Sequence, residues 1–210
     1  DRLRQVGEAI EASDPTSAPP LAIVCDVADE DQVRGAVAEH MAHWGRLDAL
    51  VNNAGAMLLG TVERQATAEW RRMIDANLWG LIVCTQAALP HLRASRGHVV
   101  NVSSVAGRRA MAGMAVYNAT KFGVCAFSEA LRQEVSEAGV RVTVIEPGIT
   151  ETELLDGMHD PQVLAMLKAR YGHIEKLRAG DVAEAIAYAL RQPARVSVNE
   201  ILVRPTGQPH

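Results

Sequence analysis

Residues 98–148, HVVNVSSVAGRRAMAGMAVYNATKFGVCAFSEALRQEVSEAGVRVTVIEPG, decide the fold of this chain. They begin with a short apolar run, HVVNVSS, and continue through a long stretch of helical spacing that ends at Gly139. A second apolar run, VRVTVIEPG, completes the segment. Two apolar runs joined by a long helix are typical of neighbouring parallel strands, whose connection has to cross the sheet. We therefore expect a strand–helix–strand unit here.

The same alternation extends in both directions along the chain. The expected strands outside this unit are PLAIVCDV (20–27), LDALVNNAG (47–55) and NEILVRP (199–205). The expected helices outside it cover residues 1–12, 28–45, 67–97 and 179–193, with a polar, irregular stretch before the last. Apolar strands that alternate with long helices predict an α/β fold, a doubly wound, Rossmann-like parallel sheet covered on both faces. We expect one domain over residues 1–210.

Composition limits the classes of function. The chain has 210 residues, 48% hydrophobic and 22% charged, as in soluble globular proteins. A net charge of −4 without a block of Lys or Arg gives no electrostatic support for a nucleic-acid or membrane partner. No apolar run approaches the roughly 18 residues of a membrane helix, and the first residues do not resemble a signal peptide. We expect a cytoplasmic protein, and no His, Cys, Asp or Glu grouping has metal-ligand spacing.

Small or polar residues follow the expected strands. These positions are Cys25–Val27, Asn52–Gly55, Ser103–Ser104 and Pro147–Gly148. The carboxyl ends of parallel strands meet at one edge of the sheet, where α/β proteins bind their ligands. The sequence therefore predicts a ligand site at this edge.

Tyr117 and Lys121 lie four residues apart in the expected helix after this edge. At that spacing two side chains share one helix face, with Cβ atoms about 5–6 Å apart. An ammonium so close would lower the pKa of a tyrosine from about 10, so that the phenol transfers protons near neutral pH. An isolated pair of this kind is more often a half-buried tyrosine beside a solvated lysine. Here Ser104, just past a strand, offers a hydroxyl to the same substrate oxygen.

Asn77 lies inside the expected helix over residues 67–97. Asparagine is a poor residue for a helix interior because its side chain competes for backbone hydrogen bonds. We therefore expect a local distortion or a water site at this position.

The motifs LVNNAG, MIDANLWG, VVNVSSVAG, YNATK and VIEPG occur in an order and spacing that resemble the short-chain dehydrogenase/reductase family, over residues 1–210. The resemblance implies that Tyr117 is the catalytic acid/base and that Ser104 hydrogen-bonds the carbonyl or alcohol oxygen. It implies that Lys121 holds the nicotinamide ribose and lowers the tyrosine pKa. Asn77 would hold a water that continues a proton relay from Lys121 to solvent.

The resemblance also implies contacts to a nicotinamide cofactor. Besides Tyr117 and Lys121, the matching positions are Asp26, Val27, Asn53, Ala54 and Gly55 on the adenosine side, and Pro147, Gly148, Thr150 and Thr152 on the nicotinamide side. The matching branch of the family consists of aldehyde reductases and 3-hydroxy acid dehydrogenases that mostly use NADP. NADP is therefore the expected cofactor, with NAD as the alternative.

One departure from the family is large. The family opens with a βαβ unit whose glycine-rich turn lets the backbone approach a pyrophosphate at a helix N-terminus. This sequence has no such turn, so we expect the domain to be N-terminally incomplete, without the segment that selects NAD or NADP. If these 210 residues were all that is present, we would expect weak NADPH binding.

The implied function is hydride transfer between NADP(H) and a small carbonyl or alcohol substrate. A 3-hydroxy acid dehydrogenase is the alternative within the enzymes. A catalytically silent scaffold or regulatory subunit is the alternative outside them, suggested by the absent turn, although the retained Ser104, Tyr117 and Lys121 argue against it.

Two further expectations concern the substrate and the assembly. Arg108 and Arg109 either bind a substrate carboxylate or are solvated loop arginines, and the sequence leaves both open. The family pairs its two long helices across two-fold axes, so we expect a homo-oligomer, a tetramer. Apolar residues on the outer faces of those helices motivate this expectation: Leu81, Val83, Phe127 and Leu131.

Overall fold

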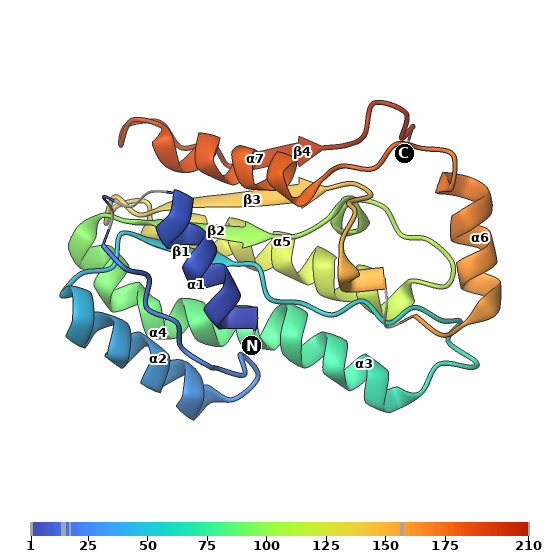
Figure 1. Ribbon diagram of the computed structural model, residues 1–210, viewed down its shortest axis with the longest axis horizontal. Coiled ribbons are helices and arrows are strands. Elements are labelled where there is room, and N and C mark those ends of the chain that lie inside the picture. The colour runs from blue at the N-terminus through green and yellow to red at the C-terminus, as the bar shows by residue number, and fades with distance from the viewer. Residues whose placement is uncertain (1, 14–15, 17, 156–157, 210) are drawn as a thin grey trace.

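A computed structural model describes residues 2–13, 16, 18–155 and 158–209, and it is organised around one parallel sheet (Figure 1). The strands are β1 (Ala49–Asn52), β2 (His98–Val102), β3 (Arg141–Pro147) and β4 (Glu200–Val203), in the spatial order β1-β2-β3-β4. Every neighbouring pair is parallel, with Val99 opposite Val142 in the central pair. The predicted parallel sheet is confirmed.

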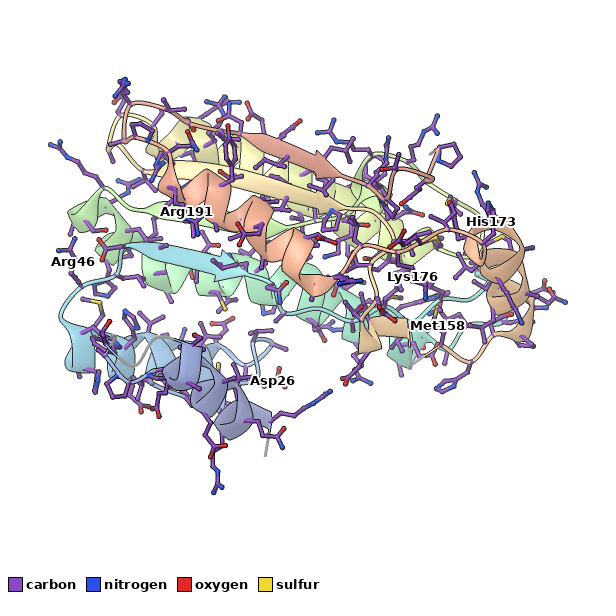
Figure 2. All side chains as sticks on the ribbon, turned by 45° about the horizontal axis from the view of Figure 1, so that its top comes forward. Asp26, Arg46, Met158, His173, Lys176 and Arg191 are labelled. Atoms are coloured by element: carbon purple, nitrogen blue, oxygen red, sulfur yellow. The ribbon has the colours of Figure 1, made fainter. Side chains whose placement is uncertain are left out.

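Helices cover both faces of this sheet. They are α1 (Arg2–Ser13), α2 (Glu30–Trp44), α3 (Thr67–Ile74), α4 (Gly80–Ser95), α5 (Ala115–Val135), α6 (Pro161–Tyr171) and α7 (Ala179–Arg191), with 3₁₀ turns at Val105–Gly107 and Glu153–Leu155. Figures 1 and 2 show α7 on one side of the strands and α4 and α5 on the other, with α2 packed against α4. The doubly wound, Rossmann-like arrangement is therefore confirmed.

The ends of α2 show how local sequence sets an element. The Asp29 side chain accepts hydrogen bonds from the backbone N–H groups of Asp31 and Gln32, as an N-cap does. Gly45 ends the helix in the left-handed region, at φ 70°, where glycine has no steric penalty. The predicted helix over residues 28–45 is confirmed.

The strand predicted over residues 20–27 is wrong. Described residues of this segment run extended but pair with no strand, and Val24 is 82% exposed. A strand forms only where a neighbour accepts and donates its backbone hydrogen bonds. The sheet of the described residues consists of β1 to β4, and none of these strands pairs with residues 20–27. The apolar side chains of residues 20–27 could not reveal that the segment has no pairing partner.

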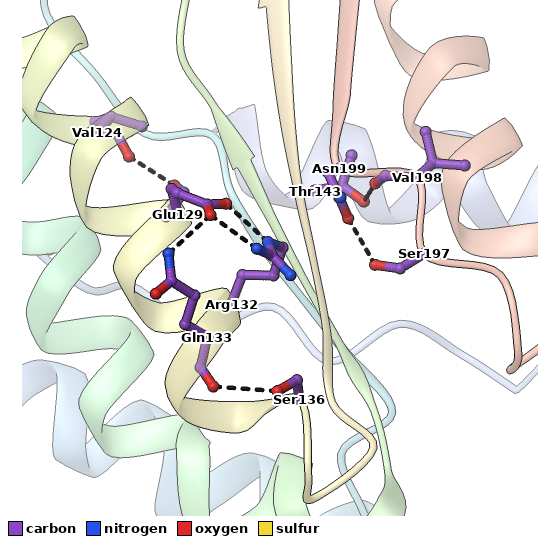
Figure 3. Close-up of polar contacts among 10 residues, drawn as sticks. Val124, Glu129, Arg132, Gln133, Ser136, Thr143, Ser197, Val198 and Asn199 are labelled. Carbon is purple, nitrogen blue, oxygen red and sulfur yellow. Dashed lines mark hydrogen bonds and ion pairs between the residues drawn. The ribbon is translucent and has the colours of Figure 1, made fainter.

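The outward-facing residues predicted on the two long helices are also corrected. Leu81, Val83 and Leu131 are buried, and Phe127 packs partly against the core. The outer side of α5 is polar near its C-terminal end, where Glu129 accepts hydrogen bonds from Arg132 and Gln133 (Figure 3). These four apolar residues therefore give no support for an oligomer.

The core beside the sheet encloses one histidine. His98 is 1% exposed, and its Nε2 lies 2.7 Å from the Thr143 hydroxyl, which itself donates to the Val198 carbonyl. The hydroxyl must then accept from Nε2, while the buried Nδ1 has no hydrogen-bond partner in the described structure. Burial, with help from Arg141, lowers the pKa of His98 to about 4. The imidazole is neutral at pH 7.

This histidine predicts a specific loss of stability in acid. The unfolded chain binds a proton near pH 6.5 and the folded chain only near pH 4, so stability is full above about 6.5 and falls as the pH drops towards 4. Burial of one neutral histidine can account for about 3 kcal/mol over that range. Urea unfolding at a series of pH values measures it. We expect His98→Gln to flatten the slope between pH 6.5 and 4.5, whereas His173→Gln, at an exposed position, keeps it. Equal slopes in all three proteins would contradict this account.

Candidate active site

A cavity of about 1320 Å³ opens at the carboxyl ends of β1, β2 and β3. Its walls come from the segments that follow these strands, from α5 and from α6 and α7. All four predicted catalytic residues line it: Asn77, Ser104, Tyr117 and Lys121. The structure thus brings together side chains from the π-helical turn after α3, the loop after β2 and one face of α5.

Ser104 and Tyr117 both line the cavity and lie near each other. Ser104 follows β2, and its hydroxyl oxygen accepts from the Ala106 N–H at 3.1 Å while its hydrogen reaches the Pro147 carbonyl at 3.4 Å. The same hydroxyl is near enough to the Tyr117 phenol to favour the ionised form of the phenol. The two hydroxyls therefore converge on one point of the cavity, as two groups that hold a single substrate oxygen must.

The direction of the Tyr117 pKa shift differs from the sequence prediction. Burial raises the pKa of Tyr117, which is 5% exposed, and the hydrogen bond from Ser104 only partly opposes this. Burial also lowers the pKa of Lys121 from 10.5 to about 8. The prediction that Lys121 lowers the tyrosine pKa is wrong for this structure, because desolvation disfavours the charged form of both groups. Tyr117 is a neutral phenol at pH 7.

The Lys121 ammonium retains hydrogen-bonding capacity. Its Nζ donates to the Val102 carbonyl at 2.9 Å and lies 5.9 Å from the centre of the Tyr117 ring. An ammonium has three donors, and the described residues provide this one acceptor. A buried donor without a partner is unfavourable. The remaining N–H groups therefore suit hydroxyl oxygens of a ligand in the cavity.

Asn77 lies in the predicted distortion. A π-helical turn, Asp75–Trp79, interrupts the long helix between α3 and α4, so that prediction is confirmed. The Asn77 side chain accepts from the Ala56 N–H at 2.7 Å, donates to the Ala56 carbonyl at 2.9 Å, and donates to the Thr120 hydroxyl at 3.2 Å. It therefore ties the segment after β1 to α5. A Cβ on Gly55 would lie 2.9 Å from its oxygen, which explains a glycine there.

Asn118 is a functional residue that the sequence interpretation missed. Its side-chain amide donates to the carbonyls of Ala106 and Arg109 at 2.7 and 2.8 Å, and its oxygen accepts from the Met111 N–H at 3.1 Å. One buried side chain, next to Tyr117, thus fixes the loop that follows Ser104. Its place within YNATK was the available signal.

The two loop arginines have different environments. Arg108 donates from Nε to Glu146 at 2.6 Å and also pairs with Glu200, so its guanidinium is not free to bind a substrate carboxylate. Its side chain is 38% exposed, so it is a solvated loop arginine that also forms ion pairs. Glu146 is 1% exposed, and pairing it with Arg108 avoids a buried, uncompensated carboxylate. Arg109 lines the cavity and is exposed.

The positions predicted to contact a cofactor divide into two groups. Those that line the cavity are Asn53, Gly55, Pro147, Gly148, Thr150 and Thr152, with Ala54 between the first two. Thr150 is held beside Leu177 by a parallel bridge. Asp26 and Val27 lie outside the lining: Asp26 is exposed and forms the turn before α2, whereas Val27 lies where a Cβ on Gly80 would collide with it.

Neither a metal centre nor a membrane span is found in the described residues. No group of three or more His, Cys, Asp or Glu side chains there could hold a metal ion. The described helices are all too short or too polar to cross a bilayer.

Comparison with known proteins assigns the class. Residues 1–162 match the family described as short chain dehydrogenase, and they include Ser104, Tyr117 and Lys121 at the carboxyl edge of the sheet. An uncharacterized oxidoreductase of Staphylococcus saprophyticus is 38% identical over 186 residues, which are 87% of this chain and 75% of that protein. The chain belongs to the short chain dehydrogenase family.

Solved structures agree with the fold. The closed form of a serine dehydrogenase complexed with NADP⁺ superposes with a TM-score of 0.85 at 32% identity, over 96% of this chain and 80% of that one. A metagenomic short-chain oxidoreductase in complex with NADP gives a TM-score of 0.78 at 27% identity, over 97% and 80%.

The hydrogen bonds of Asn118 predict a large effect of its replacement. Asn118→Leu removes three hydrogen bonds to buried or part-buried backbone groups and should lower the free energy of unfolding by about 3 kcal/mol. Loop residues 105–111 should also lose amide-exchange protection ahead of the strands. Asn199→Leu, at an exposed position, should change unfolding by less than about 0.5 kcal/mol. Equal losses in the two variants would show that Asn118 does not hold the loop.

Proposed function

We propose that this protein transfers a hydride between NADP(H) and a carbonyl or alcohol substrate in the cavity at the carboxyl edge of the sheet. The observation that carries the proposal is that Ser104 lies in the cavity near the buried, neutral phenol of Tyr117, with the Lys121 ammonium on the same helix face. The choice of NADP rests on relatives whose structures contain it. We treat residues 1–210 as one cofactor-binding domain.

The residues present fit a nicotinamide nucleoside. Lys121 has ammonium donors beyond the one that Val102 accepts, which suit the two hydroxyls of a ribose. The Gly148 backbone and the hydroxyls of Thr150 and Thr152 lie in the same cavity wall and suit a carboxamide. The predicted roles of Asn53 and Gly55 beside the adenosine half remain part of this proposal, as does the water relay through Asn77.

The chemistry of each side chain follows from its position. The cofactor supplies the hydride, with its electron pair, to the carbonyl carbon when reduction occurs. Ser104 donates a hydrogen bond to the carbonyl oxygen and stabilises the charge that develops there. Tyr117 gives its phenolic proton to the same oxygen as the C=O π bond breaks, so that an alcohol forms. Lys121 stabilises the resulting phenolate until Tyr117 takes up a proton from solvent.

The raised pKa of Tyr117 favours this direction in the free protein, because a phenol that is neutral at pH 7 is ready to donate. In alcohol oxidation the same residue would have to act as a base, which a depressed pKa would favour.

The oligomeric state and the cellular location are two further proposals. We propose a homo-oligomer, a tetramer, now on different residues: Ile74, Trp79 and Phe122 are 41–44% exposed around the π-helical turn and α5. Exposed large apolar side chains near one another favour association. We also propose a cytoplasmic location.

Replacing the proton donor tests the proposal. In the full-length protein, Tyr117→Phe should lower kcat for aldehyde reduction by about 10²–10⁴-fold while NADPH binding changes little. Only the phenolic hydroxyl is lost, so the fold is kept. The matched control is Tyr188→Phe, on α7 and outside the cavity, which should retain its activity. Retention of more than about a tenth of wild-type kcat by Tyr117→Phe would refute the assigned role.

The pKa of Lys121 predicts a pH dependence of cofactor affinity. The free protein holds an ammonium below about pH 8 and a neutral amine above it, and NADPH is an anion. The Kd for NADPH should therefore rise about tenfold between pH 7 and pH 9, provided that binding keeps Lys121 protonated. Titration of nicotinamide fluorescence measures this Kd. In Lys121→Met the Kd for NADPH should be larger than in the wild type and nearly independent of pH between pH 7 and pH 9. If the Kd of the variant rose with pH as steeply as that of the wild type, a group other than Lys121 would cause the pH dependence.

A further inference from the structure

The charged residues that line the cavity all carry the same sign. They are Arg109, Lys121, Lys168, Arg170 and Lys176, and no Asp or Glu in the described chain joins them. The whole chain contains 25 acidic and 21 basic residues, so charged residues drawn at random would include acids at least as often as bases. A cavity lined by one sign of charge concentrates ligands of the opposite sign.

Two of these cations lie on the wall assigned to the cofactor. Lys121 is on α5 beside Tyr117, and Lys176 precedes Leu177, whose backbone N–H donates to the Ile149 carbonyl at 2.9 Å. In Figure 2, Lys176 lies near Met158, between the start of α7 and α6. Lys121 precedes β3 and Lys176 follows it, and both line the cavity beside Gly148 and Thr150, where the proposed function puts the nicotinamide.

The other three cations lie on the opposite wall, formed by the loop after β2 and by α6. The Tyr171 hydroxyl lies 3.5 Å from the Met111 sulfur, which joins α6 to that loop. Arg170 lies over the Tyr171 ring at 5.5 Å, and Arg109 is held two residues before Met111 by its carbonyl bond to Asn118. Lys168 is on the same helix.

These three cations are available to a ligand. Arg109, Lys168 and Arg170 are exposed at the cavity and, among the described residues, form no ion pair. Arg108 provides the contrast, because Glu146 and Glu200 neutralise it. Cations left without a carboxylate partner at the mouth of a cavity can pair with an incoming anion.

The cavity wall between Ser104 and Tyr117 and these three cations is apolar. Five of the seven methionines of the chain line it: Met57, Met111, Met114, Met158 and Met166. Leu154, Leu164 and Leu167 add aliphatic surface. Methionine is flexible and polarizable, so such a wall accommodates alkyl chains of different shape.

We propose that the substrate has an extended alkyl chain with the carbonyl at one end and an anionic group, a carboxylate or phosphate, at the other. The carbonyl reaches Ser104 and Tyr117, the chain packs on the methionine-rich wall, and Arg109, Lys168 and Arg170 bind the anion. This inference rests on the proposed function. It separates the protein from enzymes that act on short 3-hydroxy acids, in which a single methylene lies between the carboxylate and the reacting carbon.

A matched substrate series tests the proposal. The probes are a medium-chain straight aldehyde acid, its methyl ester, and the aldehyde phosphate ester of similar length, each reduced by the full-length protein with NADPH. We expect kcat/KM for at least one of the two anions to exceed that for the methyl ester by about tenfold or more. The anion that is preferred identifies the end group. Equal values for all three compounds would overturn the proposal.

Variants test whether the three cations, Arg109, Lys168 and Arg170, cause the preference for an anionic substrate. Arg109→Met should reduce the ratio of anion to ester kcat/KM by about tenfold, and Arg109→Lys should restore part of it. The matched control is Arg93→Met, on the exposed end of α4 outside the cavity, which should keep the wild-type ratio. A change in the Kd for NADPH with an unchanged ratio would show that these cations serve the cofactor, which overturns the proposal. If no compound is turned over, the proposed function itself fails.

Discussion

The site depends on buried asparagine side chains that hold backbone segments of neighbouring loops. Asn77 binds both backbone groups of Ala56 and thereby joins the segment after β1 to α5 through Thr120. Asn118 performs the equivalent role for the loop after β2. Loops at the edge of a sheet have few packing contacts of their own, so directional hydrogen bonds from a rigid helix fix them. Without these bonds, Ser104 and Tyr117 would not be held together in one cavity.

Burial then determines the charge states within this framework. It raises the pKa of Tyr117 and lowers that of Lys121, so both shifts move the pair towards neutrality. Glu146 shows a different arrangement, in which a buried carboxylate has the Arg108 guanidinium as its partner. The Arg108–Glu146 pair anchors the start of the loop after β2 to β3. Arg109, Lys168 and Arg170 line the same cavity and form no ion pair with any residue that the structure describes, which leaves them to a ligand.

The parts of the structure encoded by local sequence could be predicted. The apolar runs of β2, β3 and β4, the glycine that ends α2, and the distortion at Asn77 each follow from residues close in the chain. The four proposed catalytic residues were found because their motifs are short and ordered, and the structure places all of them in one cavity.

The parts of the structure that depend on residues distant in the sequence could not be predicted. The segment 20–27 has the composition of a strand, but its state depends on a pairing partner that the sequence does not identify. The Arg108–Glu146 pair joins residues 38 positions apart, and the desolvation of Tyr117 is a property of the assembled cavity. Helix α6 is different: Asp160 and Pro161 form an N-cap and first-turn signal that was present and overlooked within a stretch interpreted as irregular.

The central claim is that the cavity beside Tyr117 carries out direct hydride transfer. The most direct measurement is the fate of the label from NADPH deuterated at C4 of the nicotinamide, followed by mass spectrometry of the alcohol formed from an aldehyde. The account predicts one deuterium on the carbinol carbon, from only one of the two C4-labelled stereoisomers, and none from deuterated water at that carbon. An alcohol whose carbinol hydrogen comes from solvent, or equal transfer from both isomers, would contradict it.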